Sequence, residues 1–240
     1  MIYLYLALFI ALKKAYHIFI IIISVTILSC GSDGSDKTQG IIAYKVTYPK
    51  MDKSNFMFDF MPKKMVLKFK NNNYTTSLSA GMGMYKTDFL VNQEENEFSQ
   101  MVKLINKKYI LTLKGDEIEK SINKLPAFHV EHTGETKKIL NYVCNKAIIT
   151  VDNESNDAFT VFYTDKIQIE NPNWCNQFKE IDGVLLEYQY EKYGVCMRLK
   201  AKNIKFTEID DNEFEISEKY EHISEEKMDK KMQDIFDTFK

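Results

Sequence analysis

Apolar and polar residues alternate over most of the chain beyond residue 40, and this period of two is typical of half-buried β-strands. The clearest examples are Val184–Tyr190 and Val195–Phe206. Three consecutive asparagines separate Met65–Phe69 from Tyr74–Leu78, and because asparagine favours tight turns these two runs predict a β-hairpin. Further strands are predicted at residues 40–48, 85–91, 98–105, 109–113, 128–133, 142–151 and 159–163.

Residues 54–61 instead have the spacing of a short helix that is apolar on one face. Ser54 is a suitable N-cap. The apolar positions recur at the period of a helix. They are Phe56, Met57, Phe60 and Met61. Such a helix either packs into the core or lines a cavity for an apolar ligand, because methionine gives an adaptable apolar surface.

Two further helices are predicted later in the chain. Residues 116–125 are largely polar, with Ile118 and Ile122 four positions apart, and Pro126 ends the pattern. Ser224 caps the last helix, whose apolar stripe has the spacing of an amphipathic helix. The stripe consists of Met228, Met232, Ile235, Phe236 and Phe239. We expect this helix to dock on its own domain, and contact with a partner protein or a membrane surface is the alternative.

The amino-terminal segment is apolar throughout except around Lys13 and Lys14. The run Ile18–Leu28 has the build of a secretory signal, with a basic patch before it and the small residue Ser29 after it. Ile27 to Cys30 resembles the bacterial lipobox. That resemblance implies cleavage between Ser29 and Cys30 and acylation of Cys30, which would anchor the protein to a membrane. The alternative is an uncleaved transmembrane anchor.

This interpretation divides the chain into four parts. Residues 1–29 form the signal peptide and residues 30–39 a lipidated, flexible tether rich in Gly, Ser and Asp. Residues 40–220 form the folded domain, and residues 221–240 the amphipathic helix at the carboxyl end. The predicted location is the cell envelope, with the lipid anchor in the outer membrane and the domain facing the periplasm or the surface.

Composition narrows the classes of function. Basic and acidic residues number 32 and 34, so no basic patch favours nucleic acid. An exported protein can form disulfides, but the sequence leaves open which of Cys144, Cys175 and Cys196 would pair. The alternation places Cys144 and Cys196 on the polar faces of their strands.

Candidate chemistry is sparse. His129 and Glu131 share one face of a predicted strand while His132 points to the other, and a metal site would need further ligands from elsewhere. The sequence therefore predicts no metal and no other cofactor. We find no catalytic motif, and on this basis we predict a protein that is not an enzyme.

Two stretches are distinctive: residues 135–147 (ETKKILNYVCNKA) and 178–188 (FKEIDGVLLEY). They resemble a group of exported envelope proteins, called GLPGLI proteins, in which an "ETK-I-GY-C-KA" strand precedes a "LPGLILE" strand. The resemblance implies a fold similar to the LolA and LolB lipoprotein carriers. The expected fold class is thus α+β: a curved antiparallel sheet that forms an incomplete barrel, with a short apolar helix and a carboxyl-terminal helix.

Such a fold would have an apolar cavity between its sheet and its helices. The predicted function is that of an envelope lipoprotein that binds an apolar or lipid-like ligand, with Met57, Phe60 and Met61 lining the cavity. The alternative is a structural lipoprotein of the outer membrane that contacts an envelope protein and has no small ligand. A hydrolase or metal enzyme is the third possibility, without a motif to support it.

Overall fold

The computed structural model describes residues 37–54 and 56–237 of the 240-residue chain. The predicted signal peptide, the cleavage site at Ser29 and Cys30, and most of the tether lie outside the described residues. Within the described part, no helix has the length and apolar character needed to cross a membrane.

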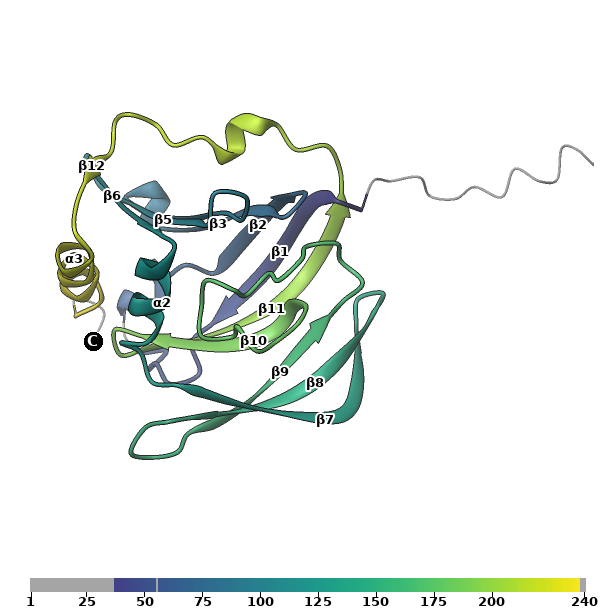
Figure 1. The fold of residues 1–240 in the computed structure, drawn as a ribbon. Helices are drawn as coiled ribbons and strands as arrows, with labels where there is room; N and C mark the ends of the chain where they lie inside the picture. Colours follow the sequence, from purple (N-terminus) through teal and green to yellow (C-terminus); the bar gives the residue numbers. More distant parts are fainter. Residues whose placement is uncertain (1–36, 55, 238–240) are drawn as a thin grey trace, which may run out of the picture. The chain divides into compact units, whose positions relative to one another are not determined.

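Twelve strands in the described residues form one sheet (Figure 1). The first part of the chain supplies β1 (Gln39–Thr47), β2 (Lys64–Lys70), β3 (Asn73–Ala80), β4 (Tyr85–Asn92), β5 (Glu97–Leu104) and β6 (Lys107–Lys114). The second part supplies β7 (Phe128–Ile139), β8 (Tyr142–Val151), β9 (Ala158–Thr164), β10 (Val184–Lys192), β11 (Val195–Phe206) and β12 (Glu221–His222). The hairpin predicted around the three asparagines is confirmed by the pairing of β2 with β3.

The strand order is β12-β6-β5-β4-β3-β2-β1-β11-β10-β9-β8-β7. It consists of two antiparallel meanders, β1 to β6 and β7 to β11. The pairing of β1 with β11 joins them, with Tyr44 opposite Ala201. At the far edge β12 runs parallel to β6, which makes the sheet mixed.

The sheet turns back on itself, so that its two ends face each other in the manner of a β-sandwich. We call β2 to β6 the upper wing and β7 to β10 the lower wing, as they lie in Figure 1. The prediction of an α+β fold with an incomplete, LolA-like antiparallel barrel is wrong, because the molecule is mainly β and its sheet is a single mixed one. Alternation along each strand is the same in both architectures, and it does not reveal how the two meanders join.

The helical elements are short. The stretch predicted as an apolar helix is the 3-10 helix η2 (Phe56–Phe60), and the remaining 3-10 turns are η3 (Gly81–Gly83) and η4 (Asp211–Phe214). The prediction of a helix after residue 116 is confirmed by α2 (Asp116–Ile122). The last helix is α3 (Glu225–Asp237), and the predicted stripe is confirmed by its buried side chains, although Phe239 lies outside the described residues. Those side chains are Met228, Met232, Ile235 and Phe236.

The main core fills the space between the two wings, where Phe69 of the upper wing, Leu186 of the lower wing and Met228 of α3 are fully buried. Two connecting segments pack on smaller, separate clusters. Residues 207–220 cross the outer face of the upper wing, where Phe214 and Tyr220 pack on a second cluster. Residues 165–183, between β9 and β10, pack inward on the lower wing. This inward segment forms part of the site described next.

Candidate functional site

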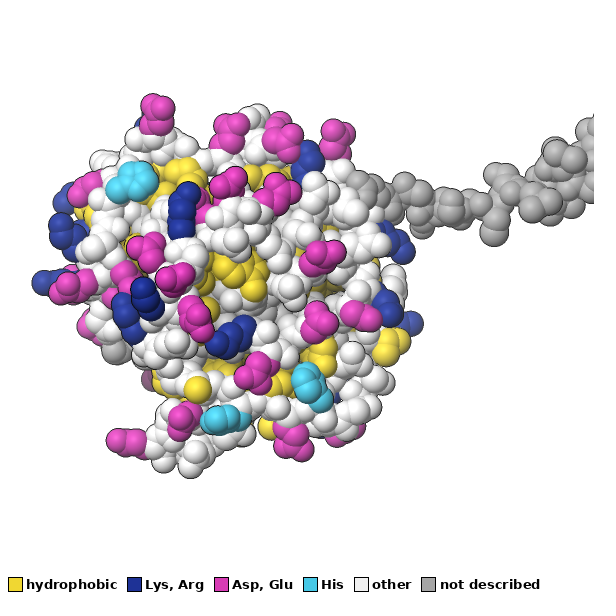
Figure 2. Space-filling view, viewed as in Figure 1, with side chains coloured by type: hydrophobic (Ala, Val, Ile, Leu, Met, Phe, Trp, Pro, Cys, Tyr) yellow, Lys and Arg dark blue, Asp and Glu magenta, His cyan; other side chains and the backbone are white. Residues whose placement is uncertain are grey.

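A cavity of about 290 Å³ lies between the two wings, and side chains from α2, α3 and residues 165–183 complete its walls. Figure 2 shows apolar side chains in the middle of one face of the molecule, surrounded by Lys, Asp and Glu. The cavity is at the lower end of the size range of small-molecule sites. Seven tyrosines contribute to its lining: Tyr44, Tyr48, Tyr74, Tyr85, Tyr188, Tyr190 and Tyr193.

Two of these tyrosines tie the upper part of the sheet to segments on the other side of the cavity. Tyr44 on β1 donates to the carbonyl oxygen of Leu185 at 2.9 Å. Tyr74 on β3 donates to the carbonyl oxygen of Pro172 at 2.7 Å. Burial raises the pKa of both phenols well above its usual value, so both remain protonated donors. These hydrogen bonds hold the wings at a fixed separation.

Tyr188 and Tyr190 on β10 present their rings to the cavity. Burial raises the pKa of both phenols, yet part of each side chain remains accessible, because each faces the open space inside. The edge of Tyr188 meets Tyr44, with ring centroids 6.1 Å apart. Among the described residues, neither hydroxyl has a hydrogen-bond partner. The lower wall therefore offers two aromatic rings with unpaired hydroxyls.

The upper wall is apolar except for a polar spot that consists of Thr76, Thr87 and Gln100. Thr76 on β3 and Gln100 on β5 flank Phe89 of β4 in register, and Thr87 lies two positions before Phe89 on the same face. All three side chains line the cavity.

Two residues of the polar spot are buried, and Thr76 is half-buried. Thr87 is 5% exposed and Gln100 is 6% exposed. The Thr87 hydroxyl lies beside Tyr85 but has no hydrogen bond of normal geometry to a described residue. An unpaired buried polar group costs about 1–3 kcal/mol. Such groups in a cavity wall indicate a ligand with polar groups of its own.

The segment before β10 is held against the cavity by Asn173. Its amide nitrogen donates to the carbonyl oxygens of Ile181 at 2.8 Å and Gly183 at 2.9 Å. Asn173 is itself buried and lines the cavity. This local network allows an irregular segment to serve as a fixed wall, because its backbone groups are paired.

Helix α3 closes one side of the cavity and is fixed by two carboxylates one turn apart. Glu225 forms an ion pair with Lys124 and accepts a hydrogen bond from the Ser121 hydroxyl at 2.6 Å. Asp229 accepts from the Lys192 ammonium at 3.2 Å and from the Tyr193 hydroxyl at 2.5 Å. One carboxylate thus connects α3 to the α2 region, and the other connects it to the hairpin between β10 and β11.

The contacts of Glu225 predict a stability that depends on pH. Burial alone would raise the pKa of this carboxyl, but hydrogen bonds from Lys124 and Ser121 outweigh burial and lower it below its usual value of 4.5. A depressed native pKa stabilises the fold above the pKa of the unfolded chain, and this contribution is lost as the pH falls through the native pKa. The melting temperature of Glu225→Gln should therefore fall less than that of wild type when the pH is lowered from neutral to about pH 3.

Glu226→Gln is the matched control, since Glu226 is the exposed neighbour on the same helix turn. It should reproduce the wild-type dependence of the melting temperature on pH. An identical pH profile for wild type and Glu225→Gln would contradict the inference that Glu225 fixes α3.

The residues predicted from sequence to line a cavity lie elsewhere. Met61 is buried in the core and Phe60 is 43% exposed, and neither is among the residues around the cavity. Met57 belongs to η2, but its side chain lies outside the described part. The lining comes instead from strand residues such as Tyr190 and Gln100. In the sequence, these residues are recognisable only as polar or aromatic residues on the inner face of an alternating strand. Such residues are also common in an ordinary core.

The three described cysteines are free and buried. The expectation that Cys144 and Cys196 lie on polar faces is wrong, because both side chains are buried. Burial raises the pKa of the Cys175 and Cys196 thiols to about 11, so both are protonated at neutral pH.

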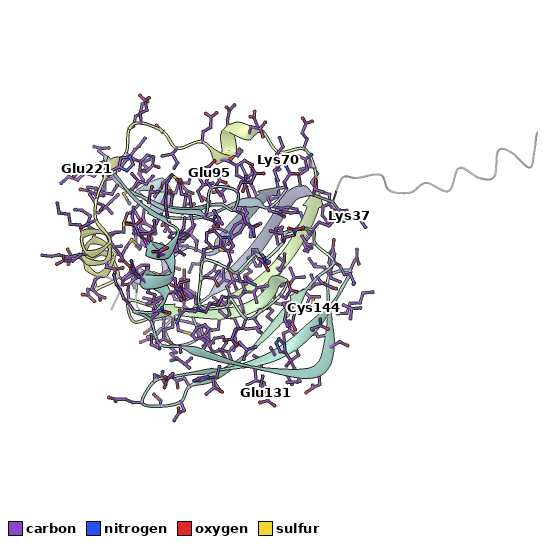
Figure 3. All side chains as sticks on the ribbon, viewed as in Figure 1. Lys37, Lys70, Glu95, Glu131, Cys144 and Glu221 are labelled. Atoms are coloured by element: carbon purple, nitrogen blue, oxygen red, sulfur yellow. The ribbon has the colours of Figure 1, made fainter. Side chains whose placement is uncertain are left out.

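His129, Glu131 and His132 are exposed on β7, and Figure 3 shows Glu131 at the outer side of the lower wing, away from the cavity. His132 pairs with the Tyr163 hydroxyl at 2.9 Å. Within residues 37–54 and 56–237, no group of three His, Cys, Asp or Glu side chains could hold a metal ion. These residues are separate from the cavity.

Comparisons with known proteins bear on this architecture. A family model described as "N-glycanase peptide, N-terminal domain" matches residues 65–205, from β2 to β11. Among solved structures, the one described as "Structure of PNGF-II in C2 space group" superposes with a TM-score of 0.51 at 17% sequence identity. The alignment covers 81% of this chain and 32% of that one, so this chain spans about a third of its length. At this identity the likeness concerns the fold. No curated protein matches the chain.

Proposed function

We propose a function from the premise that this chain belongs to the family described as "N-glycanase peptide, N-terminal domain". In our proposal the protein takes part in the processing of N-linked glycans at the cell envelope, and its internal cavity holds a saccharide. Membership in the family rests on the match between this chain and the family's sequence model. The ligand and the location are inferences from the cavity and from the amino-terminal sequence.

Family membership corrects the prediction that this protein is not an enzyme. That prediction rested on the absence of a recognisable catalytic motif, whereas the family takes its description from a glycanase. The error has a physical cause: glycoside and amide hydrolysis depend on carboxyl groups that the fold brings together, and their spacing in the sequence follows no short motif.

The observation that supports saccharide binding best is the contrast between the two walls of the cavity. The lower wall offers the rings of Tyr188 and Tyr190, and the upper wall offers the polar spot with the unpaired Thr87 hydroxyl. A pyranose has the complementary structure, with C–H groups on its ring faces and hydroxyl groups around its edge. Aromatic walls with a few converging polar groups are typical of sites that bind such small molecules.

Isothermal titration calorimetry on the full-length, detergent-extracted protein tests this proposal. The probes are two β-1,4-linked disaccharides: N,N′-diacetylchitobiose, which forms the base of common N-linked glycans, and cellobiose. We expect saturable binding of at least one of them at a single site. The absence of measurable heat from both sugars at millimolar concentrations would contradict saccharide binding.

An acyl chain is the second candidate ligand. It is favoured by the apolar part of the upper wall, where Leu67, Leu78 and Leu111 face the cavity. Mass spectrometry of organic extracts from the purified protein distinguishes the two candidates. A stoichiometric co-purified lipid, together with no disaccharide binding, would favour the acyl chain.

The lipid anchor is also a proposal, and it is supported by the lipobox-like residues Ile27 to Cys30. We predict that wild-type protein fractionates with the outer membrane and that its amino-terminal peptide carries acyl chains on Cys30. The variant Cys30→Ala lacks the thiol that would carry acyl chains. Because stable anchoring requires more than one acyl chain, this variant should leave the membrane fraction or retain its signal peptide. Unmodified Cys30 in the mature wild-type protein would contradict the proposal.

A further inference from the structure

The outer face of the sheet carries a line of lysines that contribute to neither the cavity nor the core. Six neighbouring strands each place one lysine at the same level of the sheet, and Ser79 of β3 takes the position between β4 and β2. We call this set the lysine row. It consists of Lys108 on β6, Lys103 on β5, Lys86 on β4, Lys64 on β2, Lys45 on β1 and Lys200 on β11.

The lysine row faces away from the cavity. Successive side chains of a strand point to opposite faces of the sheet. The sequence neighbours of these lysines, such as Tyr44, Met65 and Leu199, line the cavity on the inner face. The six lysines range from position 45 to position 200, so no run of basic residues marks the row in the sequence.

The lysines of the row lie directly opposite one another, and like charges in this arrangement destabilise a sheet. The register contains four such pairs, and Lys45 takes part in two of them, with Lys64 on one side and Lys200 on the other. Among the residues that the structure describes, Lys45, Lys64 and Lys103 form no ion pair. The fold therefore keeps a line of uncompensated positive charge, at a cost that a bound anion would offset.

Other lysines on the same face are neutralised by the protein itself. Lys68 and Lys70 lie farther along β2, and each is 2.6 Å from a carboxylate, that of Glu213 and that of Asp211. Both carboxylates belong to residues 207–220, which we call the acidic strap because this segment contains six acidic residues and one basic residue. The acidic strap crosses the outer face of the upper wing (Figure 1), yet its described carboxylates form no ion pair with the lysine row.

We infer that the lysine row binds an extended acidic polysaccharide, a chain with one anionic group on each sugar residue. This inference goes beyond the proposed function and does not depend on which ligand the cavity holds. Neighbouring strands are about 4.8 Å apart, so the row presents its charges at this interval over roughly 29 Å. One sugar residue of an extended chain has a comparable length, so successive anionic groups can meet successive lysines.

Two other anionic partners match the row less well. A membrane is flat, whereas the row lies on the convex side of a sheet that turns back on itself. The acidic strap lies on the same side and would repel anionic headgroups. Single-stranded nucleic acid stacks its bases on aromatic side chains, and the positions of the row hold only lysine and serine. A flexible acidic glycan requires neither a flat surface nor aromatic rings.

Fluorescence anisotropy of a labelled oligogalacturonate tests the inference on the full-length, detergent-extracted protein. Each residue of this oligomer carries one carboxylate. Wild type should bind it saturably at low salt and lose it at about 1 M salt, where the screening length falls to about 3 Å. The methyl ester of the same oligomer keeps the backbone, lacks the charges and should not bind.

A variant that removes half of the row locates the binding to these lysines. It combines Lys45→Gln, Lys64→Gln and Lys103→Gln. We expect its affinity for oligogalacturonate to fall about tenfold or more, because three charge pairs with the ligand are lost. Its melting temperature should equal or exceed that of wild type, because repulsion between opposite lysines is relieved.

The matched control changes the net charge equally but removes exposed lysines outside the row. It combines Lys120→Gln, Lys138→Gln and Lys179→Gln. This control should bind oligogalacturonate as tightly as wild type. If the row variant does not fold, Lys45→Gln alone decides, and it should weaken binding severalfold.

Several results would overturn the inference. They are no binding of oligogalacturonate to wild type, equal binding of its methyl ester, or wild-type affinity in the folded row variant. Competition identifies other partners. Displacement of the labelled oligomer by detergent micelles with phosphatidylglycerol, at a lower charge concentration than by unlabelled oligogalacturonate, would indicate a lipid surface instead. The same result with oligothymidylate would indicate nucleic acid. The disaccharide titration tests the cavity separately from all of these outcomes.

Discussion

Replacing Gly183 by alanine is expected to lower the free energy of unfolding by about 3 kcal/mol. Gly183 precedes β10 and has φ of +147°, a conformation that residues with a Cβ rarely adopt. A Cβ at this position would lie 2.8 Å from the carbonyl oxygen of Thr164 on β9. The backbone would therefore have to shift where β9 and β10 begin to pair.

Gly134→Ala is the matched control for Gly183→Ala. Gly134 also has a positive φ, of +72°, but nothing lies within 4 Å of the position that its Cβ would take. Only the conformational penalty applies there, and it should cost about 1 kcal/mol. Urea denaturation of both variants measures the difference. Equal losses would contradict the claim that close approach to Thr164 makes glycine necessary at position 183.

Gly183→Ala should also affect the cavity. The carbonyl oxygen of Gly183 accepts a hydrogen bond from Asn173, which fixes the irregular wall of the cavity. A shift of this backbone therefore moves Asn173. We expect disaccharide binding to Gly183→Ala to weaken even at temperatures where the variant remains folded.

Replacing Tyr190 by leucine is the second change with a large expected effect, a loss of about tenfold or more in affinity for the bound disaccharide, or roughly 1.4 kcal/mol. Tyr190 presents its ring to the cavity. Leucine keeps an apolar side chain but removes the flat aromatic face on which a pyranose ring can stack. Tyr190→Phe keeps that face, loses the hydroxyl and should weaken binding less.

Tyr142→Leu is the control for general effects of removing a tyrosine. Tyr142, on β8, packs against the main core and is not among the residues that line the cavity. It should lose stability without losing affinity. Tyr142→Leu should bind the disaccharide as tightly as wild type. If Tyr190→Leu does so too, the lower wall takes no part in binding.

The sequence predicted local elements well because their signals are local. The stripe that begins at Met228 repeats at the helical period, and α3 is the helix found there. The asparagines after Lys70 mark the hairpin between β2 and β3. Each of these predictions depends on residues fewer than about five positions apart in one turn or strand.

The arrangement of the elements could not be predicted in the same way. The pairing of β1 with β11 joins residues more than a hundred positions apart, and no local pattern encodes it. The sequence predicts no strand or helix in the segment before β10, yet Phe178 is buried within it. Its buried position depends on Asn173, whose hydrogen bonds replace those of a strand.

The site was missed for a related reason. Thr87 and Gln100 occupy inner positions of strands that also contain charged residues, so the sequence does not distinguish a polar cavity wall from an irregular strand face. The apolar residues around Phe60 gave a stronger local signal and drew the prediction to η2. The polar spot and the tyrosines of β10 come to line one cavity only because the two wings face each other in the fold.

The central claim is that a saccharide binds inside the cavity, and methyl NMR of the full-length protein tests it most directly. Methionine methyl groups labelled with ¹³C provide probes in the right places, since Met65, Met197 and Met232 line the cavity. Met101 is buried outside it, and Met84 is exposed on the surface. On titration with N,N′-diacetylchitobiose we predict saturable shifts of the three cavity methyl resonances, while the other two stay unchanged. Shifts confined to Met84, or none at any of the five, would contradict the claim.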